Sequence, residues 1–301
     1  MSWEGGATTA RCVASLRAQE RPPSEIVVVD NASSEDERAR LRRDLGGVPG
    51  VRLLLLDDNR QFAGGLNAGA RAAFAAGATR VLLLNNDTQL APDALARLED
   101  AMAAAPAAGI VGPVVVDLHD PGRVITAGER VLLPLLCVPR TLIRHHAHGD
   151  APYPVTGVMG CALLVTRECF EAAGGFTEEI QVYYEDVDFC LAARARGFGA
   201  MIAPLAVVRH DGMRGFAAGL TPWAAFLKAR NPWLLVRRRG SWATWPVFVP
   251  TYAAMVGASA LLYAARGRLD VVRALWRGAL AGLRVALGGA AAPAGAPRPV
   301  A

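Results

Sequence analysis

The sequence predicts an α/β fold in which helices cover both faces of a mostly parallel sheet. Short apolar runs at residues 26–29 and 81–84 have the length and composition of buried strands. Segments of helical length separate the apolar runs through residue 116, which is the element order of a three-layer domain. An Asp or Asn follows each run, and the carboxyl ends of parallel strands are where such domains bind ligands.

Composition limits the class of protein further. The 301 residues allow one or two domains with a sizeable core. The net charge of +5 comes almost entirely from arginine, without a basic stripe interleaved with aromatics, so we expect no nucleic-acid partner. The five cysteines lack zinc-site spacing, and no signal peptide opens the sequence. Both features favour the reducing, cytoplasmic side of a membrane.

The chain up to residue 56 predicts two helices and two strands. The helices are expected at residues 7–19 and 35–45, and the strands at 26–30 and 51–56. Asp30 and Asn31 follow the first strand, in a position that can contact a ligand. The alternative is a capping turn, because Ser34 precedes three acidic residues and makes a good helix start.

A glycine pair follows the second of these strands. Gly64 and Gly65 have no side chain, so the backbone could approach a ligand closely there. The helix that we expect to start near Leu66 would aim free N–H groups at the same place. The segment matches neither the dinucleotide-binding glycine pattern nor the phosphate-binding loop of ATPases.

The run at 81–84 continues into Asn85, Asn86, Asp87 and Thr88. A single carboxylate among short polar side chains is a hard-oxygen site that suits Mg²⁺ or Mn²⁺. The alternative interpretation is a turn into the next helix, with Thr88 as its N-cap.

Two further strands are expected beyond this point, at residues 157–166 and 201–208. His210 follows the second of them and is another ligand-capable side chain at a strand end. Residues 117–153 are rich in Pro, Gly, Arg and His, so we expect an irregular loop over the site.

Glu185, Asp186 and Asp188 lie at the start of the helix predicted at residues 187–195. Three carboxylates so close together repel one another unless something offsets their charge. The structural explanation is the helix dipole, which stabilises all three at an N-terminus. The functional explanation is that one of them is held in a cleft as a general base.

Five motifs occur in an order and spacing that resemble family 2 glycosyltransferases, in particular the rhamnosyltransferase-like branch that builds bacterial surface polysaccharide. They are Asp30-Asn31-Ala32-Ser33, Phe62-Ala63-Gly64-Gly65 with Asn67 and Gly69, Leu84-Asn85-Asn86-Asp87-Thr88, Gly174-Gly175-Phe176, and Glu185-Asp186-Val187-Asp188. The resemblance covers about residues 1–235, including Arg230-Asn231. It implies a GT-A-type fold, a three-layer sandwich that binds nucleotide sugars.

The resemblance also implies roles for single residues. Asp186 matches the general base of an inverting reaction, with Glu185 beside it. Asp87 matches the last acidic position of a motif that binds Mg²⁺ or Mn²⁺, and His210 can complete that site. Asn85 stands at the first acidic position of that motif, so one metal-binding carboxylate is lost. The residues implied to bind the nucleotide sugar are Asp30, Asn31, Gly64, Gly65, Asn67 and Asn86.

One feature departs from the family pattern. Family members begin with an apolar strand in the middle of the sheet, whereas this sequence opens at Met1 near the turn that should follow that strand. We therefore expect the first strand to be missing, two strand edges to be exposed, and the native start to lie upstream of Met1.

The C-terminal third differs in composition from the catalytic domain expected at 1–235. Residues 236–287 are expected to form apolar and amphipathic helices that associate with a membrane, and 288–301 a disordered tail. Residues 240–265 carry no charge and are long enough to span a bilayer. We favour attachment at the inner leaflet over a true span or over helices packed on the catalytic domain.

The sequence thus favours an inverting glycosyltransferase at the cytoplasmic face of the inner membrane. It would move a sugar, with rhamnose as the family's most frequent association, from a nucleotide-diphosphate sugar to a hydroxyl of a cell-surface glycan or polyprenyl-linked acceptor. Two alternatives stay open. One is an inactive glycosyltransferase-like scaffold subunit, which a missing strand would favour; the other is a nucleotidyltransferase, which usually needs a basic, glycine-rich phosphate loop.

Overall fold

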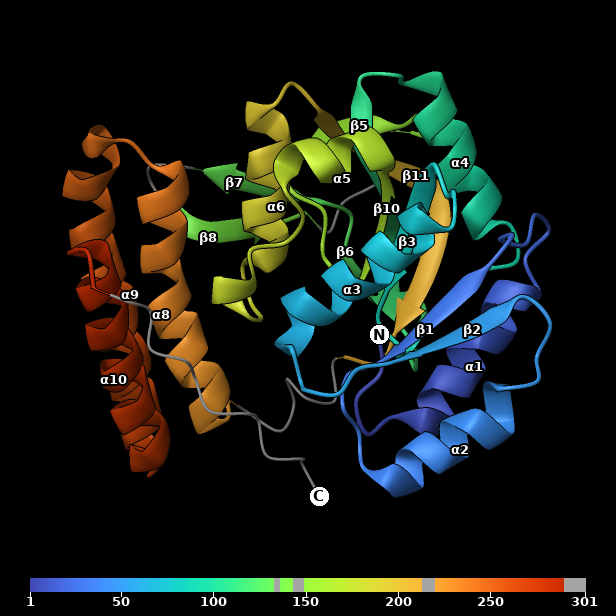
Figure 1. Cartoon of the computed structure of the whole chain (residues 1–301). Coiled ribbons are helices and arrows are strands. Elements are labelled where there is room, and N and C mark those ends of the chain that lie inside the picture. Colours follow the sequence, from blue (N-terminus) through green and yellow to red (C-terminus); the bar gives the residue numbers. More distant parts are fainter. Residues whose placement is uncertain (133–135, 143–148, 213–219, 290–301) are drawn as a thin grey trace.

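The computed structural model describes residues 1–132, 136–142, 149–212 and 220–289, so the end of the tail expected at 288–301 lies outside it. The chain has an α/β part, built around a seven-stranded sheet and the two-stranded sheet of β1 (Ile26–Asp30) and β2 (Val51–Leu55). Three long C-terminal helices lie beside this part (Figure 1). The α/β helices are α1 (Gly6–Arg17), α2 (Glu35–Leu45), α3 (Gln61–Ala75), α4 (Ala94–Ala104), α5 (Arg167–Ala173), η2 (Glu178–Ile180) and α6 (Glu185–Ala195). The C-terminal helices are α8 (Pro222–Arg239), the short η3 (Trp242–Thr244), α9 (Trp245–Ala265) and α10 (Leu269–Ala286).

The main sheet has seven strands and is mixed rather than mostly parallel. Its strands are β3 (Arg80–Leu84), β4 (Thr88–Leu90), β5 (Ala108–Asp117), β6 (Val124–Thr126), β9 (Tyr153–Val155), β10 (Ala162–Thr166) and β11 (Gly199–His210). In the central order β3-β10-β5-β11-β4, only β5 and β11 are parallel neighbours. The α/β class is confirmed, and the prediction of a mostly parallel sheet is wrong. A buried strand is apolar in either direction, so the sequence pattern does not reveal strand orientation.

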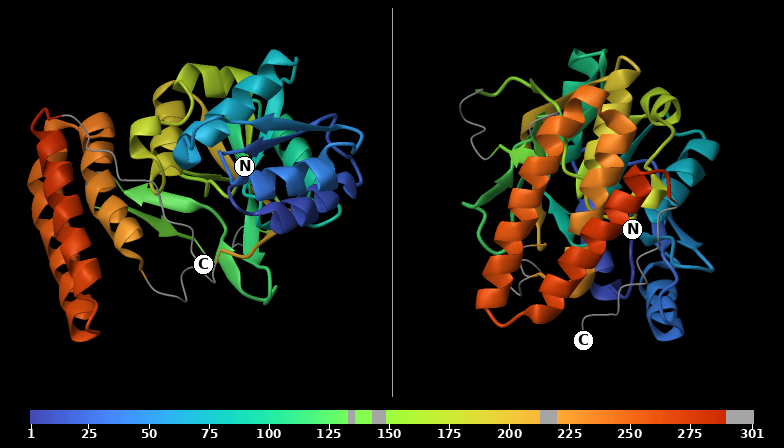
Figure 2. Two further views of the ribbon diagram at one scale, coloured as in Figure 1. Left: turned by 60° about the horizontal axis from the view of Figure 1, so that its bottom comes forward. Right: turned by 90° about the vertical axis from the view of Figure 1, so that its left-hand side faces the viewer.

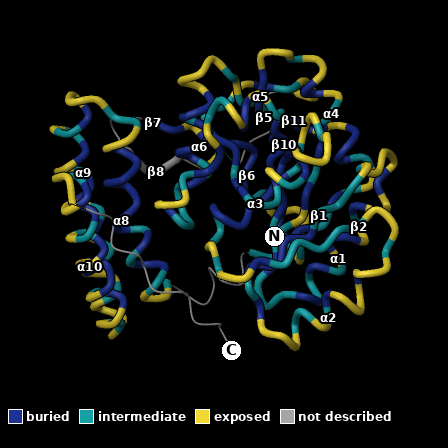
Figure 3. Tube along the Cα trace, in the orientation of Figure 1, coloured by how far each residue is buried: buried dark blue, intermediate teal, exposed yellow. Residues whose placement is uncertain are grey.

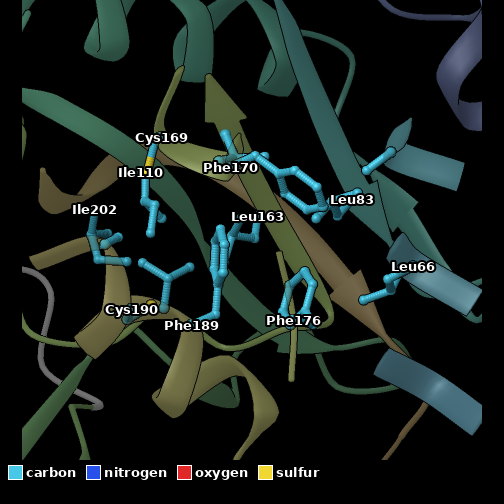
Figure 4. Close-up of a cluster of buried hydrophobic side chains, with 14 of the residues drawn as sticks. Leu66, Leu83, Ile110, Leu163, Cys169, Phe170, Phe176, Phe189, Cys190 and Ile202 are labelled. Carbon is cyan, nitrogen blue, oxygen red and sulfur yellow. The ribbon is translucent and has the colours of Figure 1, made fainter. Parts of the chain in front are cut away.

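The helices lie on both faces of this sheet, which confirms the three-layer arrangement. Leu163 and Val165 of β10 belong to the core under α3, α5 and α6. The intervening Leu164 faces the opposite core with α4. Alternating side chains of one strand therefore serve two cores. In Figure 4 the rings of Phe170, Phe176 and Phe189 meet in the first of these cores, beside Leu163.

A gap separates the main sheet from the two-stranded parallel sheet of β1 (Ile26–Asp30) and β2 (Val51–Leu55). Among the described residues β1 pairs along its length only with β2, and β3 only with β10. A cavity of about 1020 Å³ lies between β1 and β3. The chain start contacts both sides of it: Ser2 N donates to Val29 O at 2.7 Å, and the Met1 amine donates to Leu84 O at 3.0 Å. Among the described residues, no strand lies between β1 and β3.

The segment expected to be an irregular loop is more ordered than its composition suggests. Within residues 117–153 the structure has β6 and the antiparallel pair β7 (Glu129–Leu132) and β8 (Leu136–Thr141). These strands are held by partners distant in sequence: Glu129 N donates to Gly157 O, for example. Residue propensity carries no information about such contacts.

The three long C-terminal helices form a second hydrophobic unit that packs against the α/β part (Figure 2). Trp233 of α8, Phe248 and Tyr252 of α9, and Leu275 of α10 share one buried cluster with Val187 of α6. The helix α8 runs through residue 235, where the sequence suggested a domain boundary. The structure therefore groups α8 with the C-terminal helices.

A buried ion pair fixes α8 to α6. The Asp188 side chain is 1% exposed and accepts hydrogen bonds from Arg239 at 2.7 and 3.0 Å and from Thr177 Oγ1 at 2.7 Å. We expect Asp188→Ala to lower the free energy of unfolding by about 3 kcal/mol, because it leaves the Arg239 charge without its partner. Urea unfolding monitored by circular dichroism measures this loss.

The control for this prediction is the exposed ion pair between Arg21 and Asp100, in which Nη2 and Oδ2 are 2.8 Å apart. Asp100→Ala should change the stability by less than about 1 kcal/mol, since solvent screens exposed pairs. Equal losses in the two variants would contradict a special role for Asp188.

Candidate active site

The end of β3 and the end of β11 bring Asp87 and His210 together. His210 lies opposite Thr88 in the β11–β4 ladder, and Asp211 N donates to Asp87 O at 3.1 Å. These backbone contacts place Nε2 of His210 3.2 Å from Oδ1 of Asp87. The Asn85 amide nitrogen lies 3.5 Å from the same imidazole nitrogen.

Two buried oxygens at this place, Oδ1 of Asn85 and Oδ1 of Asp87, accept no hydrogen bond, although His210 Nε2 lies 3.2 Å from the Asp87 oxygen. Buried polar atoms are normally satisfied, so these oxygens beside an imidazole are candidate ligands of a cation. Among the described residues no three His, Cys, Asp or Glu side chains are grouped to hold a metal. One carboxylate, one imidazole and one amide oxygen fit an ion that takes few protein ligands and completes its shell with water and phosphate, as Mg²⁺ and Mn²⁺ do.

The carboxyl group of Asp186 lies at the start of α6 and is half-buried. Its Oδ2 accepts a hydrogen bond from Gly160 N, and its Oδ1 accepts one from Val187 N, both at 2.8 Å. Burial raises the pKa of Asp186, and these backbone N–H groups oppose the rise by stabilising the charged form. An anion that is oriented by backbone donors and partly desolvated can accept a proton from a bound hydroxyl.

The neighbouring Glu185 is more deeply buried. It is 5% exposed, and its Oε2 has no hydrogen-bond partner. Burial first, and the charge of Asp186 second, raise the pKa of Glu185 well above its usual value. The raised pKa favours the protonated form of Glu185, whereas the backbone donors to Asp186 favour its anion.

Adjacent residues connect the Asp87 end of the site to Asp186. Gly160 donates to the Asp186 carboxylate, and the next residue, Cys161, accepts from Asn85 N at 3.0 Å. The candidate metal ligands at Asn85 and Asp87 and the candidate base Asp186 therefore lie beside the same backbone segment, residues 160–161. This segment fixes their relative positions.

The loop before α6 has an unusual backbone. Gln181, Tyr183 and Tyr184 have φ values of +70°, +66° and +73°, which non-glycine residues rarely adopt. Asn231 holds this loop, because its side-chain amide donates to the carbonyls of Ile180, Val182 and Tyr183. Such strain persists only where surrounding contacts enforce it, and it is concentrated at functional sites.

The residues implied to bind the nucleotide lie between β1 and α3. Asp30 is fully buried and pairs with Arg38 at 2.8 Å, while its Oδ1 has no partner. The Asn31 amide donates to Asn59 Oδ1 and Gln61 O, and its oxygen accepts from Arg60 N. Asn31 therefore shapes the turn into α3.

The expected start of α3 near Leu66 is wrong, because the helix begins at Gln61. Gly64 and Gly65 therefore lie inside its first turns and not in a loop before it. A Cβ at Gly65 would be 2.5 Å from the Met1 sulfur, so the glycine permits close packing against the chain start. Asn31 explains the earlier start, since it binds the turn just before the helix.

Asn67 and Asn86, also predicted to bind the nucleotide sugar, use their side-chain amides for hydrogen bonds within the protein. Asn67 is 1% exposed, donates to Phe176 O at 2.8 Å and accepts from Phe176 N at 2.8 Å. Asn86 donates to Gly5 O and to the hydroxyls of Thr8 and Thr9 at the start of α1. Both side chains tie together the elements that border the site.

The sequence did not single out one acidic residue, Glu129. Its carboxyl group is 5% exposed, and its charge interacts with that of Asp186. Glu129 belongs to no motif and lies in the segment expected to be an irregular loop, so the sequence carries no signal for it.

The comparison with known families decides the identity of the chain. A family model described as "Glycosyl transferase family 2" matches residues 4–162, more than half of the chain. The chain belongs to glycosyltransferase family 2. An uncharacterized protein of Mycobacterium tuberculosis is 30% identical to this glycosyltransferase over 198 residues, which are 65% of this chain and 67% of the relative.

A second relative has a named activity. It is an N-acetylglucosaminyl-diphospho-decaprenol L-rhamnosyltransferase of M. tuberculosis, 27% identical over 268 residues, which cover 80% of this chain and 84% of the relative. The solved structure of a Pyrobaculum calidifontis mannosyltransferase, in complex with GDP-mannose and Mn²⁺, has a TM-score of 0.58 at 20% identity. It covers 94% of this glycosyltransferase and 85% of its own chain, which confirms the GT-A-type fold.

The outer face of this glycosyltransferase's C-terminal unit is apolar. In α9 only Phe248, Tyr252, Val256 and Ala260 are buried, one stripe of a helix that carries no charge over its 21 residues. The segment 242–265 is long and apolar enough to cross a membrane. Figure 3 shows exposed stretches along the outer sides of α9 and α10. The exposed large apolar side chains from η3 to the end of α10 and the residue after it are Trp242, Val249, Leu261, Leu262, Leu269, Trp276, Leu280, Leu283 and Leu287.

Proposed function

We propose that this glycosyltransferase is a metal-dependent inverting enzyme. It would transfer a sugar from a nucleotide-diphosphate sugar to a hydroxyl of a cell-surface glycan or polyprenyl-linked acceptor. The observation that carries the proposal is the contact of Asp87 with His210 beside the unsatisfied oxygen of Asn85, together with the connection through residues 160–161 to Asp186. The relative named as an N-acetylglucosaminyl-diphospho-decaprenol L-rhamnosyltransferase supports this acceptor class. Its name also makes rhamnose the first donor sugar to test.

Asp186 would be the general base. Its two backbone hydrogen bonds orient the carboxylate, which takes the proton as the acceptor oxygen bonds to the anomeric carbon. Attack by one hydroxyl on the face opposite the leaving nucleoside diphosphate inverts that carbon. Glu185, whose raised pKa favours the protonated acid, would donate a hydrogen bond to the acceptor.

Asp87 and His210 would hold Mg²⁺ or Mn²⁺, with Asn85 as a further oxygen donor. A bound divalent ion stabilises the negative charge that grows on the departing diphosphate. The Mn²⁺ in the Pyrobaculum mannosyltransferase complex supports a divalent metal here. Within the protein, the pairing of β11 with β4 keeps His210 at a fixed distance from Asp87.

The nucleotide would bind between β1 and the start of α3. Asp30 keeps one unpaired buried oxygen there, and Asn31, Gly64 and Gly65 form the adjoining backbone. Asn67 and Asn86 would stabilise this pocket without contacting the nucleotide, because their side-chain amides form hydrogen bonds with other residues of the protein. Isothermal titration with dTDP-, UDP- and GDP-sugars in the presence of Mn²⁺ tests the proposal. Binding of one nucleotide class supports it, and binding of none contradicts it.

The C-terminal helices would attach the catalytic domain, expected at 1–235, to the cytoplasmic face of the inner membrane. The uncharged α9 exposes most of its surface, and Arg273, Arg277 and Arg284 alternate with apolar side chains along α10. Such a surface suits the boundary between acyl chains and anionic headgroups. Attachment there would bring the site to a lipid-linked acceptor.

We expect the double variant Trp276→Glu/Leu280→Glu to bind phosphatidylglycerol vesicles about tenfold more weakly than the wild type, because it places charges on the lipid-facing side of α10. Both side chains are exposed, so the fold should be unaffected. Vesicle co-sedimentation measures the change. The control is Leu205→Glu, an exposed leucine on β11 and outside this face. Equal binding by the wild type and the double variant would argue against attachment through α10.

A further inference from the structure

Glu129 is a buried acid whose carboxyl group has no hydrogen-bond or ion-pair partner among the described residues. Its main chain is fixed at the start of β7, because its N–H donates to Gly157 O and its carbonyl accepts from Thr156 N and Gly157 N. Its side chain is 95% buried, given the 5% exposure, and its Oε2 receives no hydrogen bond. A carboxyl group in such a place has to hold a proton or face a ligand.

Two glycines bring Glu129 close to the candidate base. A Cβ at Gly157 would be 3.2 Å from both Cβ and Oε2 of Glu129, so the carboxyl group lies directly against that glycine. Three residues later, Gly160 donates to Asp186 Oδ2, and a Cβ there would be 3.4 Å from the same oxygen. The two glycines at the ends of residues 157–160 thus contact the two carboxyl groups, Gly157 that of Glu129 and Gly160 that of Asp186.

The Glu129 carboxyl group forms no ion pair within the described part of the chain. The acidic and thiol groups that interact electrostatically with it are Glu185, Asp186, Cys161 and Cys190. Arg130, Arg194 and Tyr153 line a cavity of about 320 Å³ together with Glu129, and neither of these two arginines pairs with it. Burial, with the charge of Asp186 as the second cause, raises the pKa of Glu129 to about 8.

We propose that Glu129 is a positioning residue of the transfer reaction, which acts through Asp186 by setting how strongly that carboxylate attracts the acceptor's proton. The inference rests on the proposed function, in which Asp186 is the base. While Glu129 holds its proton, the two groups together carry one negative charge. Once Glu129 has released it, they carry two, and the repulsion makes Asp186 a stronger base.

The chemical step balances in both states. The acceptor O–H bond breaks, its proton moves to Asp186, and the oxygen bonds to the anomeric carbon. The bond from that carbon to the diphosphate oxygen breaks, and its electron pair leaves with the nucleoside diphosphate. If Glu129 is protonated, proton transfer to Asp186 reduces the number of negative charges on the two carboxyl groups from one to zero. If Glu129 is ionised, it reduces that number from two to one.

The test compares Glu129→Gln with the wild type from pH 6 to 9.5, with kcat/KM as the readout. Glutamine has the shape of the protonated acid and cannot ionise. We expect the two enzymes to agree within about twofold below pH 7, and the wild type to be about threefold faster above pH 8.5, as general-base strength predicts. Superimposed profiles, or an equal loss at every pH, would overturn the inference. The control is Glu171→Gln, an exposed acid on α5.

A second readout needs no activity. The folded-state pKa of about 8 lies above the ordinary value of 4.5, so the folded protein holds a proton that the unfolded chain releases between these values. Wild-type stability therefore falls as the pH rises from 4.5 to 8. The melting temperature of Glu129→Gln minus that of the wild type should grow over this range and then level off. A constant difference would overturn the inference, whereas an inactive wild type with a growing difference would count against the proposed function alone.

Discussion

Asp186→Asn should abolish transfer, with a loss of about a thousandfold in kcat, and leave donor binding unchanged. The amide keeps the size of the carboxyl group, and its oxygen can still accept from Gly160 N. It cannot take a proton from the acceptor, and general bases contribute about 10² to 10⁴-fold to such reactions. Steady-state kinetics with a saturating donor measure kcat, and calorimetry measures the donor affinity.

The matched control is Glu185→Gln on the adjacent residue. Burial raises the pKa of Glu185 and favours its protonated form, which glutamine resembles, so this variant should lose far less activity, within about tenfold. If Asp186→Asn kept more than a tenth of the wild-type kcat, Asp186 would not be the base. If the two variants lost activity equally, the assignment of distinct roles to the two carboxyl groups would be wrong.

Asp87→Ala should reduce kcat/KM at least a hundredfold and remove the effect of Mn²⁺ on donor affinity. Among the described residues, Asp87 provides the carboxylate in contact with His210, so the variant leaves the ion without its anionic protein ligand. The wild type should lose activity in EDTA and regain it when Mn²⁺ or Mg²⁺ is added. Donor titrations with and without metal measure the coupling directly.

A surface variant controls for indirect effects of removing an aspartate. Asp93 forms an exposed pair with Arg97 before α4, so Asp93→Ala should keep its activity and its metal dependence. Undiminished activity of the wild type in EDTA, or a normal metal response of Asp87→Ala, would contradict the assignment of Asp87 as a metal ligand.

Local sequence patterns were sufficient for much of the fold. The apolar runs at 26–30 and 81–84 became β1 and β3, and the acidic segment after Ser34 became α2. Strand direction was not predictable, because a buried strand such as β10 has the same apolar composition in a parallel or an antiparallel sheet. The start of α3 depends on Asn31, which lies 30 residues before Gln61 and binds its carbonyl.

In the candidate site, too, the sequence predicted some features and missed others. The positions of Asp87, Asp186 and His210 at element ends followed from the motifs. That the Asn67 and Asn86 side chains bind protein could not be predicted, since their partners are Phe176 and the distant start of α1. Glu129 was missed because its burial depends on backbone contacts to residues 156 and 157.

One measurement tests the central claim most directly: the wild-type enzyme is given a panel of nucleotide sugars with a synthetic N-acetylglucosaminyl-diphospho-polyprenol, with and without Mn²⁺. Nucleoside diphosphate release is followed, and the anomeric configuration of the product is read by NMR. Metal-dependent release from one donor, with a glycosidic bond of inverted configuration, is the result that we predict. A product with retained configuration, or release at the same rate in EDTA, would contradict a metal-dependent inverting transfer.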